Sequence, residues 1–218
     1  MTTRTRDVLV VALTLTTGAV DAVTLLRLGN VFSSVITGNL ALLGVSAGRH
    51  DATLALNGGL ALAGYGIGVL AGTPFARVPE GGQPPWPARV TVTLSAELGL
   101  LVAFSALWLV SGEQRGTPAR LALLMLAAAA MGMQSTAVRR LGQMSSTYLT
   151  STLTGVLSAF ALRRVPSEWP RSVGVLAAMV TGAVLGALAA VYSPGWVVMT
   201  VLAPLVAVIA CSLFLTTT

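Results

Sequence analysis

Long apolar segments follow one another along almost the whole chain of 218 residues. A helix that crosses a bilayer needs about 20 mostly apolar residues, because each residue advances it by about 1.5 Å. Polar or glycine-rich breaks separate eight apolar segments, which comprise residues 8–26, 31–46, 52–72, 90–110, 119–138, 145–161, 172–191 and 196–215. Six of them reach spanning length, whereas residues 31–46 and 145–161 are shorter and more polar. The pattern predicts an all-α polytopic membrane protein in which residues 1–218 form a single integral membrane domain.

The scarcity of charge supports this class and excludes others. Only 9% of the residues are charged, against about 25% in soluble domains, so lipid must cover much of the surface. The 13 basic residues are scattered between the apolar segments, which is typical of topology determinants and does not favour nucleic-acid binding. The sequence has no enzyme motif, and its single histidine and single cysteine cannot build a metal site. We expect no enzyme activity, cofactor or metal, and a lipid bilayer as the main partner.

A weak internal repeat divides the chain into two halves, about 1–112 and 113–218. Residues 21–40 align without a gap with residues 134–153, a shift of 113 residues that brings the tripeptide Arg-Leu-Gly at 27–29 onto the same tripeptide at 140–142. The alignment also pairs Asp21 with Gln134 and Asn39 with Thr152. The matches fall on polar and glycine positions rather than on the common Leu and Val, and they predict two related halves with four apolar segments each.

Short motifs along the chain resemble a known family. They include Gly18-x-x-Asp21, the sequence Arg-Leu-Gly-Asn-Val-Phe at 27–32 and the sequence Thr-Gly-Asn at 37–39. With a trailing Leu-Leu-Gly and the Arg-Arg-Leu-Gly and Thr-x-Thr elements of the second half, the chain resembles the YoaK-type bacterial membrane protein family, a domain of unknown function. Ser151 departs from the pattern, because the resemblance implies a glycine there. The resemblance implies a multi-pass protein of the bacterial inner membrane and no particular substrate.

Two carboxylates inside apolar segments are candidates for chemistry. Asp21 lies where a central carboxylate costs about 2.5–3.5 kcal/mol on insertion scales, so we expect it to face the interior of the bundle. Two interpretations stay open, because Asp21 would either bind an ion or proton or pair with Arg27 or Arg140. Glu97, in the fourth apolar segment, is a second candidate unless it lies at the depth of the lipid headgroups.

Polar stretches in the two shorter segments complete the predicted site. Gly38 can open the backbone at 37–39, which would expose amides and carbonyls to an ion or solute; the alternative is a continuous helix with Asn39 bonded to a neighbouring helix. Residues 145–154 carry eight hydroxyl groups in ten positions, so this stretch faces protein or water. An inverted repeat would bring these stretches together near the membrane midplane, and the predicted substrate-binding residues are Asp21, Thr37, Gly38, Asn39, Gln134, Thr150 and Thr152.

Glycines spaced by four residues mark two helix faces for close packing. Gly64 and Gly68 match Gly182 and Gly186 at a shift of 118 residues, and this spacing permits close approach of helices in membranes. We expect these faces to pack between the two halves or between the subunits of a homo-oligomer. The residues assigned a structural role are Arg27, Arg140, Gly64, Gly68, Gly182 and Gly186.

The number of crossings stays open between six and eight. If residues 31–46 and 145–161 dip in and return, six helices span, and nine arginines lie on the N-terminal side against four on the other. Eight spans give eight against five, and leaving out Arg27 and Arg140 gives eight against three in both topologies, so the positive-inside rule does not decide. We favour six, because the two segments are short and polar and because three spans per half make an inverted repeat. The N-terminus is then expected on the cytoplasmic side.

Two functional interpretations follow from these observations. A transporter or channel for a small polar solute or ion would explain the repeat, the intramembrane Asp21 and the two polar segments. A membrane scaffold, sensor or partner subunit is the alternative, in which the polar residues only hold helices together. Large soluble loops would favour the alternative, and the longest connection between apolar segments has about 17 residues. We favour transport, and no feature of the sequence identifies the cargo.

Overall fold

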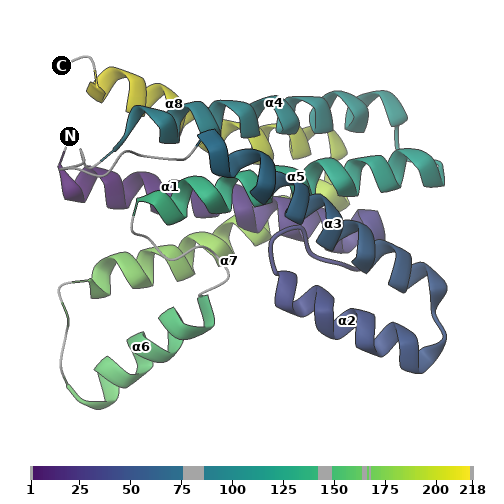
Figure 1. The fold of residues 1–218 in the computed structure, drawn as a ribbon, viewed down its shortest axis with the longest axis horizontal. Helices are drawn as coiled ribbons and strands as arrows, with labels where there is room; N and C mark the ends of the chain where they lie inside the picture. Colours follow the sequence, from purple (N-terminus) through teal and green to yellow (C-terminus); the bar gives the residue numbers. More distant parts are fainter. Residues whose placement is uncertain (1, 76–85, 142–148, 164–165, 167, 217–218) are drawn as a thin grey trace.

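Six long helices form the body of the protein (Figure 1). The computed structural model describes residues 2–75, 86–141, 149–163, 166 and 168–216, and these residues are almost entirely helical. The long helices are α1 (Thr3–Val23), which continues as the π-helical turn η1 (Thr24–Gly29), α3 (Ala52–Phe75), α4 (Ala88–Ser111), α5 (Thr117–Arg140), α7 (Trp169–Tyr192) and α8 (Val197–Thr216), which follows the 3₁₀ turn η3 (Pro194–Trp196). All six are long and apolar enough to cross a membrane. The predicted all-α polytopic fold is confirmed.

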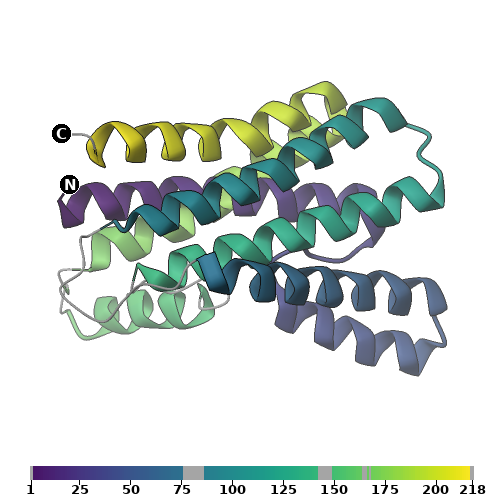
Figure 2. The ribbon, with the colours of Figure 1, turned by 45° about the horizontal axis from the view of Figure 1, so that its top comes forward.

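Two short helices complete the described structure. Helix α2 (Ile36–Arg49) has 14 residues and α6 (Leu149–Ala161) has 13. At about 1.5 Å per residue each is roughly 20 Å long, less than the hydrocarbon core of about 30 Å. Figures 1 and 2 show α2 and α6 at opposite ends of the bundle, with the start of α1 and the end of α8 at the same end as α6. The helix lengths therefore agree with six spans rather than eight, although residues 145–148 of the predicted segment lie outside the described residues.

The long helices pack in a fixed order. Helix α1 lies along α7, and α3 lies along α5. Helix α4 contacts both α5 and α8, and α8 also contacts α1. Because α2 packs on α3 and α6 packs on α7, the helices follow one another in space as α2, α3, α5, α4, α8, α1, α7 and α6. Each short helix thus lies on an outer flank of the six-helix bundle.

Glycines allow the closest of these contacts. A Cβ atom at Gly68 on α3 would collide with the backbone carbonyl of Ala129 on α5. Gly182 on α7 faces the backbone carbonyl of Leu15 on α1 in the same way. Neither contact leaves room for a side chain, so the backbones of the paired helices touch along these seams.

The same contacts recur in the two seams 114 residues apart. Gly132 on α5 meets the carbonyl of Tyr65 on α3, and Gly18 on α1 meets the carbonyl of Met179 on α7. Gly68 and Gly182 are 114 residues apart, and so are the residues that they contact, Ala129 and Leu15. The same separation of 114 residues relates Gly132 to Gly18 and Tyr65 to Met179. Gly68 and Gly182 therefore occupy equivalent positions in the two seams, whereas the spacing of 118 residues in the sequence had matched Gly64 with Gly182.

Candidate functional site

Asp21 is buried on α1, with 2% of its surface exposed, and it holds a stretch of non-helical backbone. Its Oδ1 atom accepts hydrogen bonds from the Ser33 amide (2.8 Å), the Ser33 hydroxyl (2.6 Å) and the Ser34 amide (2.8 Å). Its Oδ2 atom accepts a hydrogen bond from the Ser34 hydroxyl (2.5 Å). Among the described residues Asp21 forms no ion pair, so the expected alternative of pairing with Arg27 or Arg140 does not describe this structure.

Two asparagines hold the neighbouring backbone. The amide side chain of Asn39, on α2, accepts a hydrogen bond from the Phe32 amide (3.0 Å) and donates one to the Phe32 carbonyl (2.6 Å). Asn57, on α3, donates a hydrogen bond from Nδ2 to the Gly29 carbonyl (3.2 Å). Asp21 and Asn39 therefore hold residues 30–35, which we call the re-entrant segment, and Asn57 holds Gly29 directly before it.

The re-entrant segment turns back toward the middle of the bundle. The chain leaves η1 through Asn30, which has a left-handed backbone (φ 57°), and then returns to the level of Asp21. Asp21 precedes Gly29, the end of the span, by eight residues, which corresponds to about 12 Å along a helix. Helix α2 therefore begins on the flank of the bundle at the depth of Asp21 and runs away from the middle of the span (Figure 1). The positive end of its dipole lies at this depth.

Gln134 and the first turn of α2 lie near this segment. Gln134, on α5, accepts a hydrogen bond from the Thr17 hydroxyl (2.6 Å) and donates one to the Leu13 carbonyl (3.2 Å), so it links α5 to α1 one helical turn before Asp21. Thr37 is exposed on α2. Gly38 packs near Phe32, where a Cβ atom would stand 3.6 Å from the ring. The expected opening of the backbone at 37–39 is wrong, because these residues are helical in α2 and the non-helical stretch precedes them.

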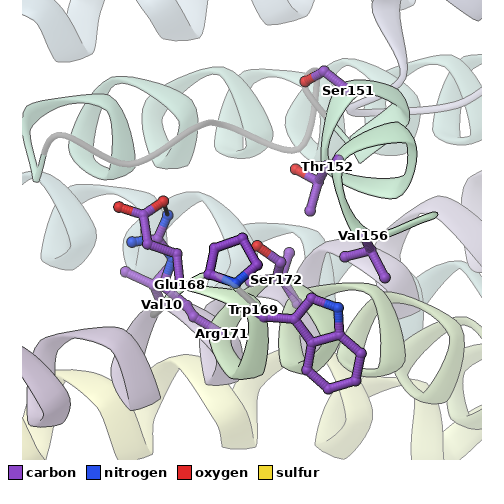
Figure 3. Close-up of a pocket in the computed structure, with 11 residues that line it drawn as sticks. Val10, Ser151, Thr152, Val156, Glu168, Trp169, Arg171 and Ser172 are labelled. Carbon is purple, nitrogen blue, oxygen red and sulfur yellow. Dashed lines mark ion pairs between the residues drawn. The ribbon is translucent and has the colours of Figure 1, made fainter. Parts of the chain in front are cut away.

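Thr150 and Thr152 lie on α6, in a different hollow. Thr150 is exposed, whereas Thr152 lines a cavity of about 240 Å³ between α6, α7 and α1. Figure 3 shows Thr152 on α6 facing Ser172 and Trp169 of α7 across this cavity. The structure thus brings Asp21 and Asn39 together, with Gln134 one turn away, and places the two α6 threonines apart from them.

A second hollow of about 450 Å³ lies between the end of α1, the start of η1 and the middle of α7. Asp21 and Phe32 contribute to its wall, and the other lining side chains are apolar. The two hollows follow one another along α7, because Val175 lines the first and Met179, one turn later, lines the second. The described residues contain no group of three His, Cys, Asp or Glu side chains that could hold a metal ion.

The arginines assigned a structural role differ in their surroundings. Arg27 donates hydrogen bonds from Nε (2.9 Å) and Nη2 (2.5 Å) to the Ala190 carbonyl, near the end of α7. A cation at the C-terminus of a helix also interacts favourably with the helix dipole. Arg140 is exposed at the end of α5.

Sequence reasoning missed the partners of the predicted residues. Ser33 and Ser34 are the residues of the re-entrant segment that bond Asp21, and Asn57 holds Gly29 directly before it; none of them was predicted as a site residue. Adjacent serines inside an apolar segment are a signal that could have found the first two. No spacing rule would have linked Asn57 to Gly29, because the contact joins two separate helices.

The fold and the buried re-entrant segment define a multi-pass, all-α membrane protein. The chain belongs to a family described as "Protein of unknown function (DUF1275)", whose profile matches residues 9–212. It is 36% identical over 154 residues to the "UPF0700 transmembrane protein YoaK" of Bacillus subtilis (strain 168). The match covers 70% of this chain and 66% of that relative, just under two thirds of its length. These similarities confirm the family resemblance, and no solved structure matches the chain.

Proposed function

We propose that this protein moves a small polar solute or ion across the bacterial inner membrane, as a carrier or a channel. One observation carries the proposal: the re-entrant segment lies at the level of Asp21, inside the span, with the N-terminus of α2 beside it. Backbone that is not helical is expensive at membrane depth and is found where it is buried in protein or lines a cavity. Discontinuous helices that start at this depth are typical of transporters, where they present backbone groups to a substrate.

An inverted relation of the two halves supports the same proposal. Six spans put three in each half, so a repeat of the first half in the second must run through the membrane in the opposite direction. The matching glycine seams of α3 with α5 and of α1 with α7 are the contacts that such a repeat would generate. Opposed halves of this kind rock against each other around a central site in many transporters.

The proposed orientation places the N-terminus in the cytoplasm. With six spans, nine arginines share its side of the membrane, among them Arg4 and Arg6, and four lie on the other side. An excess of arginine marks the cytoplasmic side. In this orientation α6 enters from the cytoplasmic face and α2 enters from the opposite face.

A second candidate function is a non-transporting scaffold, sensor or partner subunit. The observation that favours it is the saturation of Asp21 and Asn39, whose polar groups are bonded within the protein. If these bonds never open, the residues only fasten α2 to the bundle. The two candidates therefore differ in whether the polar groups of the re-entrant segment ever meet a solute.

Reconstitution in liposomes tests the proposal. Pools of inorganic ions and small metabolites are offered to vesicles that hold the purified protein, and uptake is compared with that of empty vesicles. Asp21→Asn keeps the shape of the side chain and removes its charge, and the matched variant Asp51→Asn changes a carboxylate that caps α3 through the Leu54 amide (2.9 Å). We expect uptake in the wild type and in Asp51→Asn, with loss in Asp21→Asn. Uptake by no pool, or equal uptake by a folded Asp21→Asn variant, would favour the second candidate.

A further inference from the structure

A second carboxyl group is buried in the bundle, without a hydrogen-bond partner in the described part of the chain. Glu97 lies on α4, on the stripe of buried residues that includes Leu94, Leu101 and Phe104, and none of its surface is exposed. Among the residues that the structure describes, neither carboxyl oxygen has a hydrogen-bond partner. Glu97 therefore occupies a position in the core where the helix otherwise presents apolar side chains.

Contacts between α4 and α8 place Glu97 well inside the membrane. The Thr91 and Ser212 hydroxyls lie 3.1 Å apart at one end of this helix pair, and the Trp108 indole donates a hydrogen bond to the Pro194 carbonyl (2.8 Å) at the other. The two helices run antiparallel, so Glu97, six residues after Thr91, is level with the residues of α8 that lie about six before Ser212. Pro204 lies close to that level, inside α8. Proline cannot donate a backbone hydrogen bond, which leaves one carbonyl of the preceding turn without its helical partner.

No opposite charge is available to Glu97 from the helices packed against it. Helix α5 carries Arg120, Arg139 and Arg140 toward its ends, and none of them forms an ion pair with Glu97. Cys211 on α8 is exposed, and the hydroxyl of Tyr65 on α3 donates a hydrogen bond to Ser135 (2.8 Å). Arg89 lies two turns away near the start of α4 itself. In the described part of the chain, nothing offsets a negative charge at this position.

An unpartnered carboxylate is costly in such surroundings. Insertion scales penalise a charged side chain at the centre of a spanning helix, and an isolated buried charge is avoided by protonation. The neutral acid is therefore the form that fits this packed, apolar core. Ionisable residues inside spanning segments are rare and commonly mark proton relays or ion paths.

We propose that Glu97 is a proton-binding site, occupied in this conformation and emptied when the bundle opens to water. Binding adds one proton from solvent to one carboxylate oxygen and removes one negative charge from the core. The role of this step in coupling a proton gradient to solute movement rests on the transport function proposed above. The contrast with Asp21 supports the assignment, because four hydrogen bonds hold Asp21 as an acceptor while Glu97 is left without any.

Infrared difference spectroscopy in lipid nanodiscs tests proton binding without any need for transport. We expect the wild type at neutral pH to show the carbonyl band of a protonated carboxylic acid, which Glu97→Gln removes. Glu113→Gln is the matched control, because Glu113 is exposed in the turn after α4 and its variant should keep the band. If Glu97→Gln leaves the protonated band unchanged, the inference is wrong.

Stability measurements exclude a purely structural role. Since Glu97 has no partner, Glu97→Gln and Glu97→Leu should both fold, and the melting temperature of Glu97→Leu should equal or exceed that of the wild type. Loss of the folded state in both variants would overturn the inference, because it would reveal a bond that this carboxyl group must make.

Proteoliposomes with a pH gradient test the coupling. With any solute that the wild type carries, Glu97→Gln should retain downhill exchange and lose the component of uptake that the pH gradient drives. Gradient-driven uptake in Glu97→Gln would overturn the coupling role. If Glu97 is protonated but the protein carries no solute, the proton-binding site is supported and the transport function is contradicted.

Discussion

The two flanks of the bundle carry the same kind of short helix and hold it differently. Helix α2 begins in a buried re-entrant segment, fastened by Asp21, Asn39 and Asn57. Helix α6 presents most of its side chains outward, with Ala159 as its only buried residue, and an open cavity separates part of it from α7. Among the described residues, hydrogen bonds to Asp21 and Asn39 therefore hold the start of α2, whereas a cavity borders α6.

The helices that precede α2 and α6 in the sequence, α1 with η1 and α5, differ in length by one residue between the glycine seam and the Arg-Leu-Gly tripeptide. The glycine seams are displaced by 114 residues, whereas the Arg-Leu-Gly tripeptides are displaced by 113. The first half therefore holds one more residue between Ala19 and Arg27 than the second half holds between Met133 and Arg140. A π-helical turn takes up one residue more than an α-helical turn, and η1 lies in this stretch, whereas α5 stays α-helical to Arg140. We interpret η1 as the turn that absorbs the extra residue beside Asp21.

The largest loss of stability is expected from substitutions in the two glycine seams, where the two halves of the chain make equivalent contacts. Gly68→Leu and Gly182→Leu should each abolish most of the folded protein, because a side chain there meets a backbone carbonyl that cannot move aside. Overpacking of a core costs about 1–3 kcal/mol, and more against backbone. Folded yield in detergent, measured by size-exclusion chromatography, gives the comparison.

Gly99→Leu is the control for these variants, since no atom lies within 4 Å of a Cβ built at Gly99 on α4. Equal losses at Gly68 and Gly182, with none at Gly99, would sharpen the equivalence of the seams. Wild-type yield of both seam variants would refute the packing assignment.

Removal of the carboxylate that fastens α2 should have the next largest effect. Asp21→Ala leaves two amides and two hydroxyls of Ser33 and Ser34 without their acceptor, and breaking a buried charged contact costs about 3–5 kcal/mol. Asp51→Ala removes a helix cap at the same end, which is worth about 1 kcal/mol. Thermal unfolding in detergent should rank Asp21→Ala well below Asp51→Ala. The reverse ranking would show that the re-entrant segment does not depend on Asp21.

Asn39 and Thr152 occupy corresponding places in the sequence repeat, and their substitution compares the flanks directly. Asn39→Ala should cost about 2 kcal/mol, because the amide and carbonyl of Phe32 each lose a partner inside the bundle. Thr152→Ala changes a half-buried side chain beside a cavity, and its cost measures how firmly the corresponding position of α6 is held. Urea or thermal denaturation of the two purified variants measures the difference. Equal costs would mean that α6 is fastened as firmly as α2.

The smallest effect concerns the arginines of the repeated tripeptide. Arg27→Gln should destabilise the protein by about 0.3–1 kcal/mol, because the exposed guanidinium stabilises the fold only through its hydrogen bonds to the Ala190 carbonyl and its interaction with the dipole of α7. Arg140→Gln should change stability less, because Arg140 is exposed at the end of α5. A larger loss at Arg140 than at Arg27 in the same unfolding assay would contradict the placement of these two side chains.

The long helices could be predicted from the sequence, whereas most partners of the polar residues could not. Length and hydropathy were enough to find the six helices that could span a membrane and to mark residues 31–46 and 145–161 as shorter and more polar, because a span has a minimum length. The position of Asp21 inside a span was also readable. Its serine partners depend on a chain reversal at Asn30, which hydropathy does not report.

Contacts between helices were the second feature that could not be predicted from the sequence. The sequence aligned Gln134 with Asp21 but could not show that Gln134 bonds Thr17 and Leu13 across the α1–α5 contact. The spacing of the glycines predicted two faces for close packing but aligned Gly64, instead of Gly68, with Gly182. The alignment was one turn out of register because glycines recur every four residues along each helix. Only the three-dimensional contacts decide which turn meets which.

Sided labelling tests most directly the claim that two short helices enter from opposite faces between six spans. In a Cys211→Ser background, single cysteines replace the exposed residues His50, Ser193 and Arg163, and a membrane-impermeant maleimide is applied to oriented vesicles from each side. Six spans predict that His50→Cys and Ser193→Cys react from the same side and Arg163→Cys from the other. If His50→Cys reacts together with Arg163→Cys and opposite to Ser193→Cys, α2 and α6 cross the membrane and the account is wrong.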